Sequence, residues 1–217
     1  RTGYLINIKE IDRAVRAGVL PILARSCESA PSPPAPLMSD LLGAIERSIP
    51  DIVRSIRLSI TPTYHMETDV NDRQRVTIRQ RFDFAAAHRL HVPDLSEREN
   101  DDIFGKCNNP NGHGHNYQIE PAVRVNASST GFTLSTLERL TDETIIERFD
   151  HKHLNLDTDE FADGNGLNPT VENIARVCYE LLEQAIAEST GDDAALDSVT
   201  VWETDRTCAT YPATASP

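Results

Sequence analysis

Two histidines two positions apart, His113 and His115, follow a turn-rich segment that carries Cys107. Successive side chains of a β-strand alternate between faces, so a strand beginning at His113 would place both imidazoles on one face. His88 lies upstream on the apolar parity of an alternating segment, so we expect it on the same face of a neighbouring strand. Three neutral imidazoles with an open fourth position form the ligand set of a catalytic zinc site. The alternative is one core histidine and two turn histidines.

Cys107 lies in a polar segment rich in Asn, Gly and Pro, away from any apolar stripe. A nearby metal and histidine favour the thiolate form of a cysteine, which could then act as a base or a nucleophile. A spare loop thiol and a fourth metal ligand are the alternatives. Cys178 fits an apolar helical stripe and is expected to be a packing residue, while Cys27 and Cys208 carry no signal.

Three carboxylates are further candidates. Asp150 directly precedes His151 and could orient its imidazole for acid–base work, although a helix-end charge pair has the same sequence. Glu203 shares the inward parity of two valines before it, where a charge is costly unless it binds something. An amidine-like ring edge would suit this carboxylate, and a salt bridge to an arginine is the alternative. Glu172, in the first turn of a predicted helix, could simply favour the helix dipole. His91 and His153 do not share the inward strand parity of the three candidate ligands, so we expect them at the surface or behind those ligands.

The elements that position these groups follow from hydrophobic periodicity. Alternation predicts strands over residues 56–60, 64–73, 74–90, 113–125 and 199–203. Helical spacing predicts helices over residues 3–20 and 41–49, over 131–149 after a short strand, and from 170 to 186. Loops are expected over residues 91–106 and 150–155, and fraying from about Pro212. The proline-rich segment 29–36 is expected to be neither helix nor central strand.

Length and charge limit the function classes. A chain of 217 residues can hold one large domain or one and a half small ones. The net charge of −13 argues against a nucleic-acid partner, because phosphate binding needs a basic face. No apolar run is long enough to span a bilayer, so no membrane partner is expected. The four scattered cysteines and the lack of a secretory signal favour a reducing cytoplasm, and the start at Arg1 indicates a fragment or processed form.

A weak internal repeat suggests the domain organisation. The order helix, helix, strand over residues 3–20, 39–49 and 55–61 recurs over residues 131–149, 170–186 and 198–204. The first copy lacks the histidines, the cysteine and the glutamate. We therefore expect a degenerate half-unit over residues 1–72, with two helices, a strand pair and no site residues, followed by a complete catalytic domain over residues 73–217.

Five motifs taken together resemble the 6-pyruvoyl-tetrahydropterin synthase family. They are FDFAAAHRL, FGKCNNPNGHGHNY, DHKHLNLD, PTVENIA and VTVWETD, in the family's order between about Arg79 and Tyr211. The resemblance implies an α+β T-fold (tunnelling fold), an antiparallel four-stranded sheet with two helices on one face. Such sheets close side by side into a barrel, which removes exposed edges and implies a homo-oligomer. Residues 1–72 depart from the family pattern and indicate a fused tandem protein.

Site roles carried over from this resemblance fall on the candidates above. It implies Zn²⁺ held by His88, His113 and His115, with Cys107 as catalytic base beside Asp150 and His151, and the pterin ring anchored by Glu203 with help from Glu172. The implied reaction removes triphosphate from 7,8-dihydroneopterin triphosphate, with internal redox rearrangement to 6-pyruvoyl-tetrahydropterin. Mg²⁺ could accompany the triphosphate. Lys106 and Arg89 are candidates to meet the phosphates because they adjoin the motifs.

Two other functions stay open at this point. The sister enzyme, 6-carboxy-tetrahydropterin synthase of the queuosine pathway, shares the zinc, the cysteine and the Asp–His pair. Its cysteine usually stands closer to the HGH motif, so the longer spacing from Cys107 to His113 resembles the pyruvoyl enzyme. A zinc-holding T-fold scaffold without catalysis is the second alternative, and the presence of the cysteine, the Asp–His pair and the glutamate argues against it.

Overall fold

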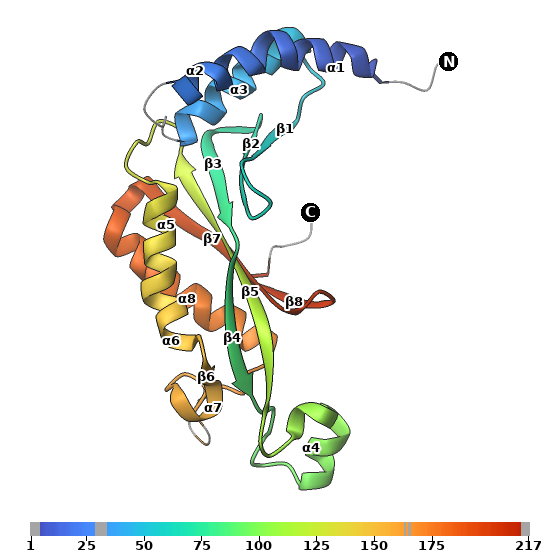
Figure 1. Cartoon of the computed structure of the whole chain (residues 1–217), viewed down its shortest axis with the longest axis vertical. Helices are drawn as coiled ribbons and strands as arrows, with labels where there is room; N and C mark the ends of the chain where they lie inside the picture. Colours follow the sequence, from blue (N-terminus) through green and yellow to red (C-terminus); the bar gives the residue numbers. More distant parts are fainter. Residues whose placement is uncertain (1–4, 29–33, 163, 165, 214–217) are drawn as a thin grey trace. The chain divides into compact units, whose positions relative to one another are not determined.

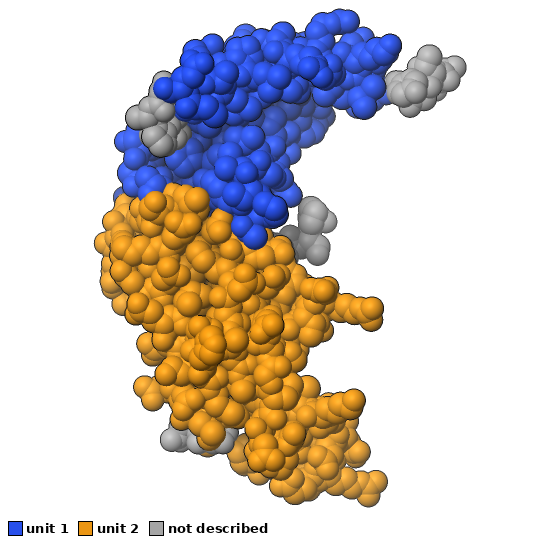
Figure 2. Space-filling model, viewed as in Figure 1, with its two compact units in different colours: residues 1–79, 124–133, 192–194 blue, residues 80–123, 134–191, 195–217 orange. Residues whose placement is uncertain are grey.

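The computed structural model describes residues 5–28, 34–162, 164 and 166–213. The chain divides into two compact units (Figure 2). Unit 1 comprises residues 1–79, 124–133 and 192–194, and unit 2 comprises residues 80–123, 134–191 and 195–217. The expected boundary at 72/73 falls at the start of β3, whereas this division keeps residues 73–79 in unit 1 and adds short segments of β5 and of the turn after α8. The degenerate repeat over residues 1–72 stays a prediction.

Unit 1 consists of helices packed on a small antiparallel sheet. Its elements are α1 (Ile8–Ala14), the π-helical turn η1 (Val15–Val19), α2 (Leu20–Glu28), α3 (Pro34–Ser48), β1 (Ser55–Ser59), β2 (Tyr64–Asp69) and β3 (Asp72–Gln80, whose last residue belongs to unit 2). β1 pairs antiparallel with β2, which neighbours β3. The core lies between α3 and the strands, where Met38, Leu41, Leu42, Met66, Val76 and Ile78 are buried.

Unit 2 holds the rest of the chain. Its elements are β4 (Phe82–His88), α4 (Glu97–Phe104), the 3-10 turn η2 (Gly105–Asn108), β5 (His113–Asn126), α5 (Leu134–Thr141), the π turn η3 (Asp142–Ile146), α6 (Glu147–Phe149), β6 (Lys152–His153), α7 (Leu154–Asp157), α8 (Val171–Thr190), η4 (Gly191–Asp193), β7 (Ala194–Thr204) and β8 (Thr207–Tyr211). Residues 124–126 of β5, residues 192–193 of η4, and Ala194 belong to unit 1.

The sheet of unit 2 places β4 between β5, with which it pairs antiparallel, and β6, with which it pairs parallel. β7 pairs with β5 and, antiparallel, with β8. Helices α5 and α8 lie on the same side of these strands (Figure 1). The alternation of side chains along β4 and β5 places Phe84 and Tyr117 on the same face, where their rings stack with centroids 5.1 Å apart. Phe149 of α6 packs beside Phe84 on this face.

Most predicted elements are present, with their bounds adjusted. The predicted strand over residues 74–90 is interrupted at Arg81, so it forms β3 and β4. The first helical segment continues to Glu28 through η1, where Gly18 lets the helix approach α3 closely. A Cβ on Gly18 would lie 3.4 Å from Ala44, in van der Waals contact with α3. The short strand expected before α5 is absent from the described residues.

Three predictions about loops need correction. α3 begins at Pro34, because proline tolerates the first turn of a helix, where its missing N–H would be unbonded anyway; residues 29–33 lie outside the described residues. The segment 91–106, predicted as a loop, contains α4, and residues 150–155 include β6 and the start of α7. The hairpin strand β8, which was not predicted, ends at Tyr211, just before the point from which fraying was expected. None of the helices in the described part of the chain has both the length and the apolar character needed to cross a membrane.

Candidate metal centre and active site

Three histidines converge at one end of the β4–β5 pair. His88, the last residue of β4, lies opposite His113, the first residue of β5, and Ala86 lies opposite His115. One ring nitrogen from each histidine lies within 4.8 Å of those of the other two. The Nε2 atoms of His88 and His113 are 3.2 Å apart. We refer to these three residues as the histidine tripod.

His88 is held in the tautomer that a metal ligand needs. It is fully buried, and its Nδ1 lies 2.7 Å from the carbonyl oxygen of Pro169, just before the N-cap of α8. A carbonyl can only accept, so Nδ1 carries the proton and Nε2 keeps a free lone pair. The hydroxyl of Tyr117 lies 3.3 Å from the same Nδ1. Burial lowers the pKa of His88 to about 4, so the ring is neutral at pH 7.

The donor atoms of the tripod fit a cation. The buried Nε2 of His115 has no hydrogen-bond partner among the described residues. Burial, followed by the neighbouring His115, lowers the pKa of His113, which also favours a neutral ligand. The 3.2 Å between the Nε2 atoms of His88 and His113 is close to the ligand separation of about 3.3 Å in a tetrahedral site with Zn–N bonds of about 2.0 to 2.1 Å. Two facing lone pairs at this distance repel each other unless a cation lies between them or one of the two Nε2 atoms carries the proton and donates to the other.

Glu203 of β7 faces the tripod. Its Oε1 lies 3.3 Å from Nε2 of His88 and 3.4 Å from Nε2 of His115. Its side chain is 17% exposed, so the carboxylate borders the tripod and still reaches solvent. These contacts are to histidines, whereas the alternative drawn from the sequence was a salt bridge to an arginine. A carboxylate here can strengthen a cation site or accept hydrogen bonds from a ligand above it.

Cys107 lies in η2, the short turn between α4 and β5, and is partly exposed. Its carbonyl oxygen accepts a 2.8 Å hydrogen bond from the N–H of Leu90, which ties the turn to the chain just after His88. Burial and then the charge of Glu203 raise the pKa of the Cys107 thiol. Cys107 and Glu203 are therefore close enough to affect each other electrostatically, and a cation would be needed to favour the thiolate.

The Asp150–His151 pair lies at the other edge of β4. Asp150 Oδ1 accepts a 2.8 Å bond from the N–H of Ala85, and Oδ2 lies 2.7 Å from Nδ1 of His151. The hydrogen bond from Ala85 and then that from His151 lower the pKa of Asp150. His151 has a φ of 56°, a left-handed conformation that is costly for a residue with a side chain. Its N–H donates to the Ala85 carbonyl oxygen at 2.6 Å, which helps to impose that conformation.

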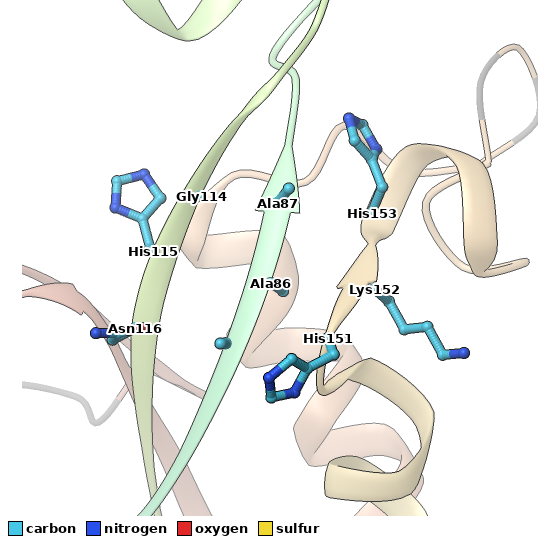
Figure 3. A pocket seen from close by; sticks show the side chains of 9 residues that line it. Ala86, Ala87, Gly114, His115, Asn116, His151, Lys152 and His153 are labelled. Carbon is cyan, nitrogen blue, oxygen red and sulfur yellow. The ribbon is translucent and has the colours of Figure 1, made fainter.

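The pair is therefore separated from the tripod by the width of one strand. β4 runs between β5, which carries His115, and the segment that carries His151 (Figure 3). An open pocket of about 480 Å³ is lined by residues 85–87, 114–116 and 151–153 of these three segments. Among the described residues, the pair is hydrogen-bonded to Ala85, to each other and, through the Asp150 N–H, to the carbonyl oxygen of Ile146 at 2.9 Å. Asp150 directly follows α6, so the helix-end interpretation also fits its position.

The remaining candidates lie around the tripod. Glu172 is exposed in the first turn of α8, where a negative charge favours the helix dipole. Lys106 lines a second pocket, of about 640 Å³, that extends to His113. Arg89 directs Nε and Nη2 to Asn108, so these two groups are not available for the phosphates that the sequence assigned to Arg89.

Several structural residues of the site were not assigned a role from the sequence. Tyr117, on the inward face of the strand, and Pro169 contact His88. The buried Asn108 and Asn155 bond to Arg89, and isolated polar residues show no periodicity. Gly112 was detectable only as a turn residue. It has a φ of 70°, and a Cβ there would lie 2.5 Å from Nε2 of His153 and 3.0 Å from the His88 carbonyl oxygen. The turn before His113 therefore requires glycine.

Comparison with known proteins accounts for this arrangement. The family model described as 6-pyruvoyl tetrahydropterin synthase matches residues 77–214. This chain belongs to the 6-pyruvoyl tetrahydropterin synthase family. Human 6-pyruvoyl tetrahydrobiopterin synthase is 35% identical over 150 residues, covering 67% of this chain and 98% of the human protein. The Poecilia reticulata protein of the same name is 37% identical over 131 residues, covering 59% of this chain and 84% of that protein.

A solved structure shows the fold of this family. The 6-pyruvoyl tetrahydropterin synthase of Caenorhabditis elegans is 34% identical and superimposes with a TM-score of 0.56, covering 64% of this chain and 96% of that chain. The predicted α+β T-fold is therefore confirmed. The matched region of the family model contains the tripod, Cys107, the Asp150–His151 pair and Glu203.

Proposed function

We propose that the chain is a zinc-dependent lyase that acts on 7,8-dihydroneopterin triphosphate and eliminates triphosphate to give 6-pyruvoyl-tetrahydropterin. The observation that carries this proposal is the histidine tripod, with Glu203 and Cys107 beside it, in a chain of the 6-pyruvoyl tetrahydropterin synthase family. The curated relatives named 6-pyruvoyl tetrahydrobiopterin synthase support this activity over that of the sister 6-carboxy enzyme.

The tripod is the proposed zinc site. His88 is neutral and fixed as an Nε2 donor by Pro169, and His113 and His115 complete a three-nitrogen set that leaves a position for a ligand. Zn²⁺ bound there would polarise the side-chain oxygens of the substrate and acidify the adjacent C–H. The neutral form of His88 at pH 7 means that this ligand does not have to lose a proton to bind.

The other side chains take the acid–base and binding roles. Cys107 would accept the substrate proton, because it lies in the turn before β5 and its carbonyl oxygen is bonded to the N–H of Leu90, two residues after His88. Asp150 orients His151 through its 2.7 Å contact with Nδ1, and such a pair is the proposed source of the returned proton. Glu203 accepts two hydrogen bonds from the amidine-like edge of the pterin ring, with Glu172 as a secondary contact.

Lys106 is the proposed contact for the triphosphate, which Mg²⁺ could accompany. It lines the pocket beside His113, and a cation there partly offsets the negative charge of both the substrate and the chain. We further propose a cytoplasmic homo-oligomer formed by barrel closure, since closure pairs the exposed edges of a T-fold sheet. In such an assembly a neighbouring copy could supply the Asp–His pair.

The test is turnover of 7,8-dihydroneopterin triphosphate, followed as triphosphate release. We expect release by the metal-loaded protein, with a product that has not lost acetaldehyde. Cys107→Ala should lower kcat by about 100-fold or more, where 100-fold is the lower end of the usual contribution of a positioned base, with metal content unchanged. His113→Ala should lower both metal content and turnover.

Cys208→Ala is the matched control, because Cys208 is exposed on β8 and takes no part in the site. Its turnover should equal that of the unsubstituted chain. Acetaldehyde among the products would favour the 6-carboxy activity instead. Full turnover by Cys107→Ala would remove the assigned base, and no turnover by a zinc-loaded protein would favour a scaffold.

A further inference from the structure

A polar network joins the strand that ends at His88 to the turn that carries Cys107. Arg89 directly follows His88, and Asn108 directly follows Cys107. The guanidinium of Arg89 donates from Nε to the Asn108 carbonyl oxygen at 3.0 Å and from Nη2 to its Oδ1 at 2.9 Å. A planar guanidinium offers two parallel donors, so one arginine fixes both the backbone and the side chain of Asn108.

Asn108 is held from all sides. It is 3% exposed, and its Nδ2 donates to Oδ1 of Asp101 on α4 at 2.8 Å. A carboxylate can only accept, which assigns Nδ2 to this side of the amide and Oδ1 to the side of Arg89. Nδ1 of His91 lies 2.9 Å from the same Oδ1 and therefore carries its proton. The turn η2 is thus anchored both to α4 and to the residues after β4, which lie side by side in unit 2 (Figure 1).

Arg89 is itself anchored at its backbone. Asn155, which is 6% exposed, accepts from the Arg89 N–H through Oδ1 at 2.8 Å and donates from Nδ2 to the Arg89 carbonyl oxygen at 3.1 Å. The side chain of Arg89 is therefore a second link, beside the bond from the Leu90 N–H to the Cys107 carbonyl oxygen, between a backbone fixed by Asn155 and the turn η2. Polar groups buried this deeply stabilise one arrangement only when all of them are paired.

We propose that Arg89 and Asn108 are positioning residues, which hold the Cys107 thiol in place beside the histidine tripod. The proposal gives Arg89 a structural task in the site in place of the phosphate contact expected from the sequence. It rests on the proposed function only for the consequence on turnover, because the anchoring of the turn can be measured without any substrate.

The four cysteines provide a direct measurement. Cys27 and Cys208 are exposed, Cys107 is partly exposed and Cys178 is fully buried on α8. Iodoacetamide labelling at a fixed pH, with each cysteine followed by peptide mass spectrometry, gives four rates from one sample. Arg89→Gln and Asn108→Ala should each raise the labelling rate of Cys107 by about tenfold or more, the shift expected when a bond to a charged group is lost. Cys178 should stay protected and metal content should stay constant.

Arg98→Gln is the matched control. Arg98 lies on α4 near the same turn, is almost fully exposed and contacts Asp102 at 3.8 Å, so it changes the charge without touching the network. Its Cys107 rate should equal that of the unsubstituted chain. Arg89→Lys keeps the charge but lacks the two parallel donors. Its Cys107 labelling rate should therefore lie between that of the unsubstituted chain and that of Arg89→Gln. The double variant of Arg89 and Asn108 should label no faster than the faster single variant, because both changes break one link.

Three results would overturn the proposal. An unchanged Cys107 rate in both Arg89→Gln and Asn108→Ala would show that the turn is held by other contacts. A parallel rise at Cys178 would show that the substitutions loosen the whole unit. A Cys107 labelling rate in the double variant that combines both single effects would show that Arg89 and Asn108 act independently and not through one link.

Turnover gives the second measurement. If the proposed function holds, Arg89→Gln should lower kcat by about tenfold to 100-fold with little change in KM, because a displaced base affects the chemical step and the pterin contacts remain. A fall in affinity alone would return Arg89 to phosphate binding and overturn the positioning role. A chain without turnover that still shows the labelling changes would overturn the proposed function and leave the anchoring of Cys107 intact.

Discussion

The Cys107 thiol and the Glu203 carboxylate share one site, and their charges oppose each other. The thiolate is the charged form of cysteine, so burial and a nearby negative charge both disfavour it and raise the pKa of Cys107. In the metal-free protein we therefore expect half-maximal alkylation of Cys107 above the ordinary thiol value of 9.0. Glu203→Gln removes the second cause and should move the alkylation profile to lower pH.

The measurement is the alkylation rate of Cys107 between about pH 7 and 10.5, the range around an ordinary thiol pKa. Glu188→Gln is the control. Glu188 is exposed on α8, so this substitution removes the same charge at a different place. Its profile should match that of the unsubstituted chain. If Glu203→Gln also matched, the assigned proximity of the carboxylate to the thiol would be wrong.

Residue parity was sufficient to predict the tripod but not its surroundings. His88, His113 and His115 fall on inward positions of two alternating strands, so their convergence follows from the period of two. The positions of Asp150 and His151 at the opposite edge of β4 depend on which strands pair, and a single sequence does not specify pairing. Glu203 was detectable as a charge at an inward position, whereas its histidine partners depend on the same pairing.

At the scale of elements, helix α4 shows which sequence signal was missed. Its residues are mostly polar, so hydrophobic periodicity predicts a loop. The signal that was present is a capping box, in which the Ser96 side chain accepts from the Glu99 N–H and the Glu99 carboxylate accepts from the Ser96 N–H at 2.8 Å. α8, in contrast, combines an apolar stripe with an N-cap at Thr170, and both signals predicted it. β8 follows a tight turn after Thr204 and is largely exposed, so alternation is weak there.

The capping box of α4 leads to a prediction about this element. Ser96→Ala removes the side chain that accepts from the helix and should destabilise α4 by about 1 kcal/mol. Hydrogen exchange of residues 97–104 should accelerate by about fivefold, the factor that corresponds to 1 kcal/mol. Because Asp101 on α4 holds Asn108, labelling of Cys107 should rise slightly as well.

Ser96→Thr is the conservative control, since threonine also caps helices, and it should restore most of the protection. Exchange in α8, which has its own cap at Thr170, should be the same in both variants. Equal exchange of α4 in Ser96→Ala and the unsubstituted chain would contradict a stabilising cap.

At the scale of the molecule, the family match divides the chain. The family model begins at residue 77, close to the end of the long N-terminal segment of unit 1 at residue 79. Every residue of the tripod, with Pro169 and Glu203, belongs to unit 2. Unit 1 has its own buried side chains on α3, β2 and β3, so it buries apolar surface independently of the site.

This division predicts that damage to the core of unit 1 leaves the tripod able to bind metal. Leu42 on α3 is 2% exposed, and Leu42→Ala should lower the stability of unit 1 by about 2–5 kcal/mol through the lost contacts and the cavity. Exchange protection should fall in residues 36–79, while zinc bound per chain should stay the same.

Leu182→Ala is the matched change in unit 2, because Leu182 is fully buried on α8. It should lower protection in α8 and weaken zinc binding, since α8 begins next to the Pro169 carbonyl that fixes His88. Loss of zinc from Leu42→Ala to the same extent would show that the site depends on unit 1, and the separation of the two units would then be wrong.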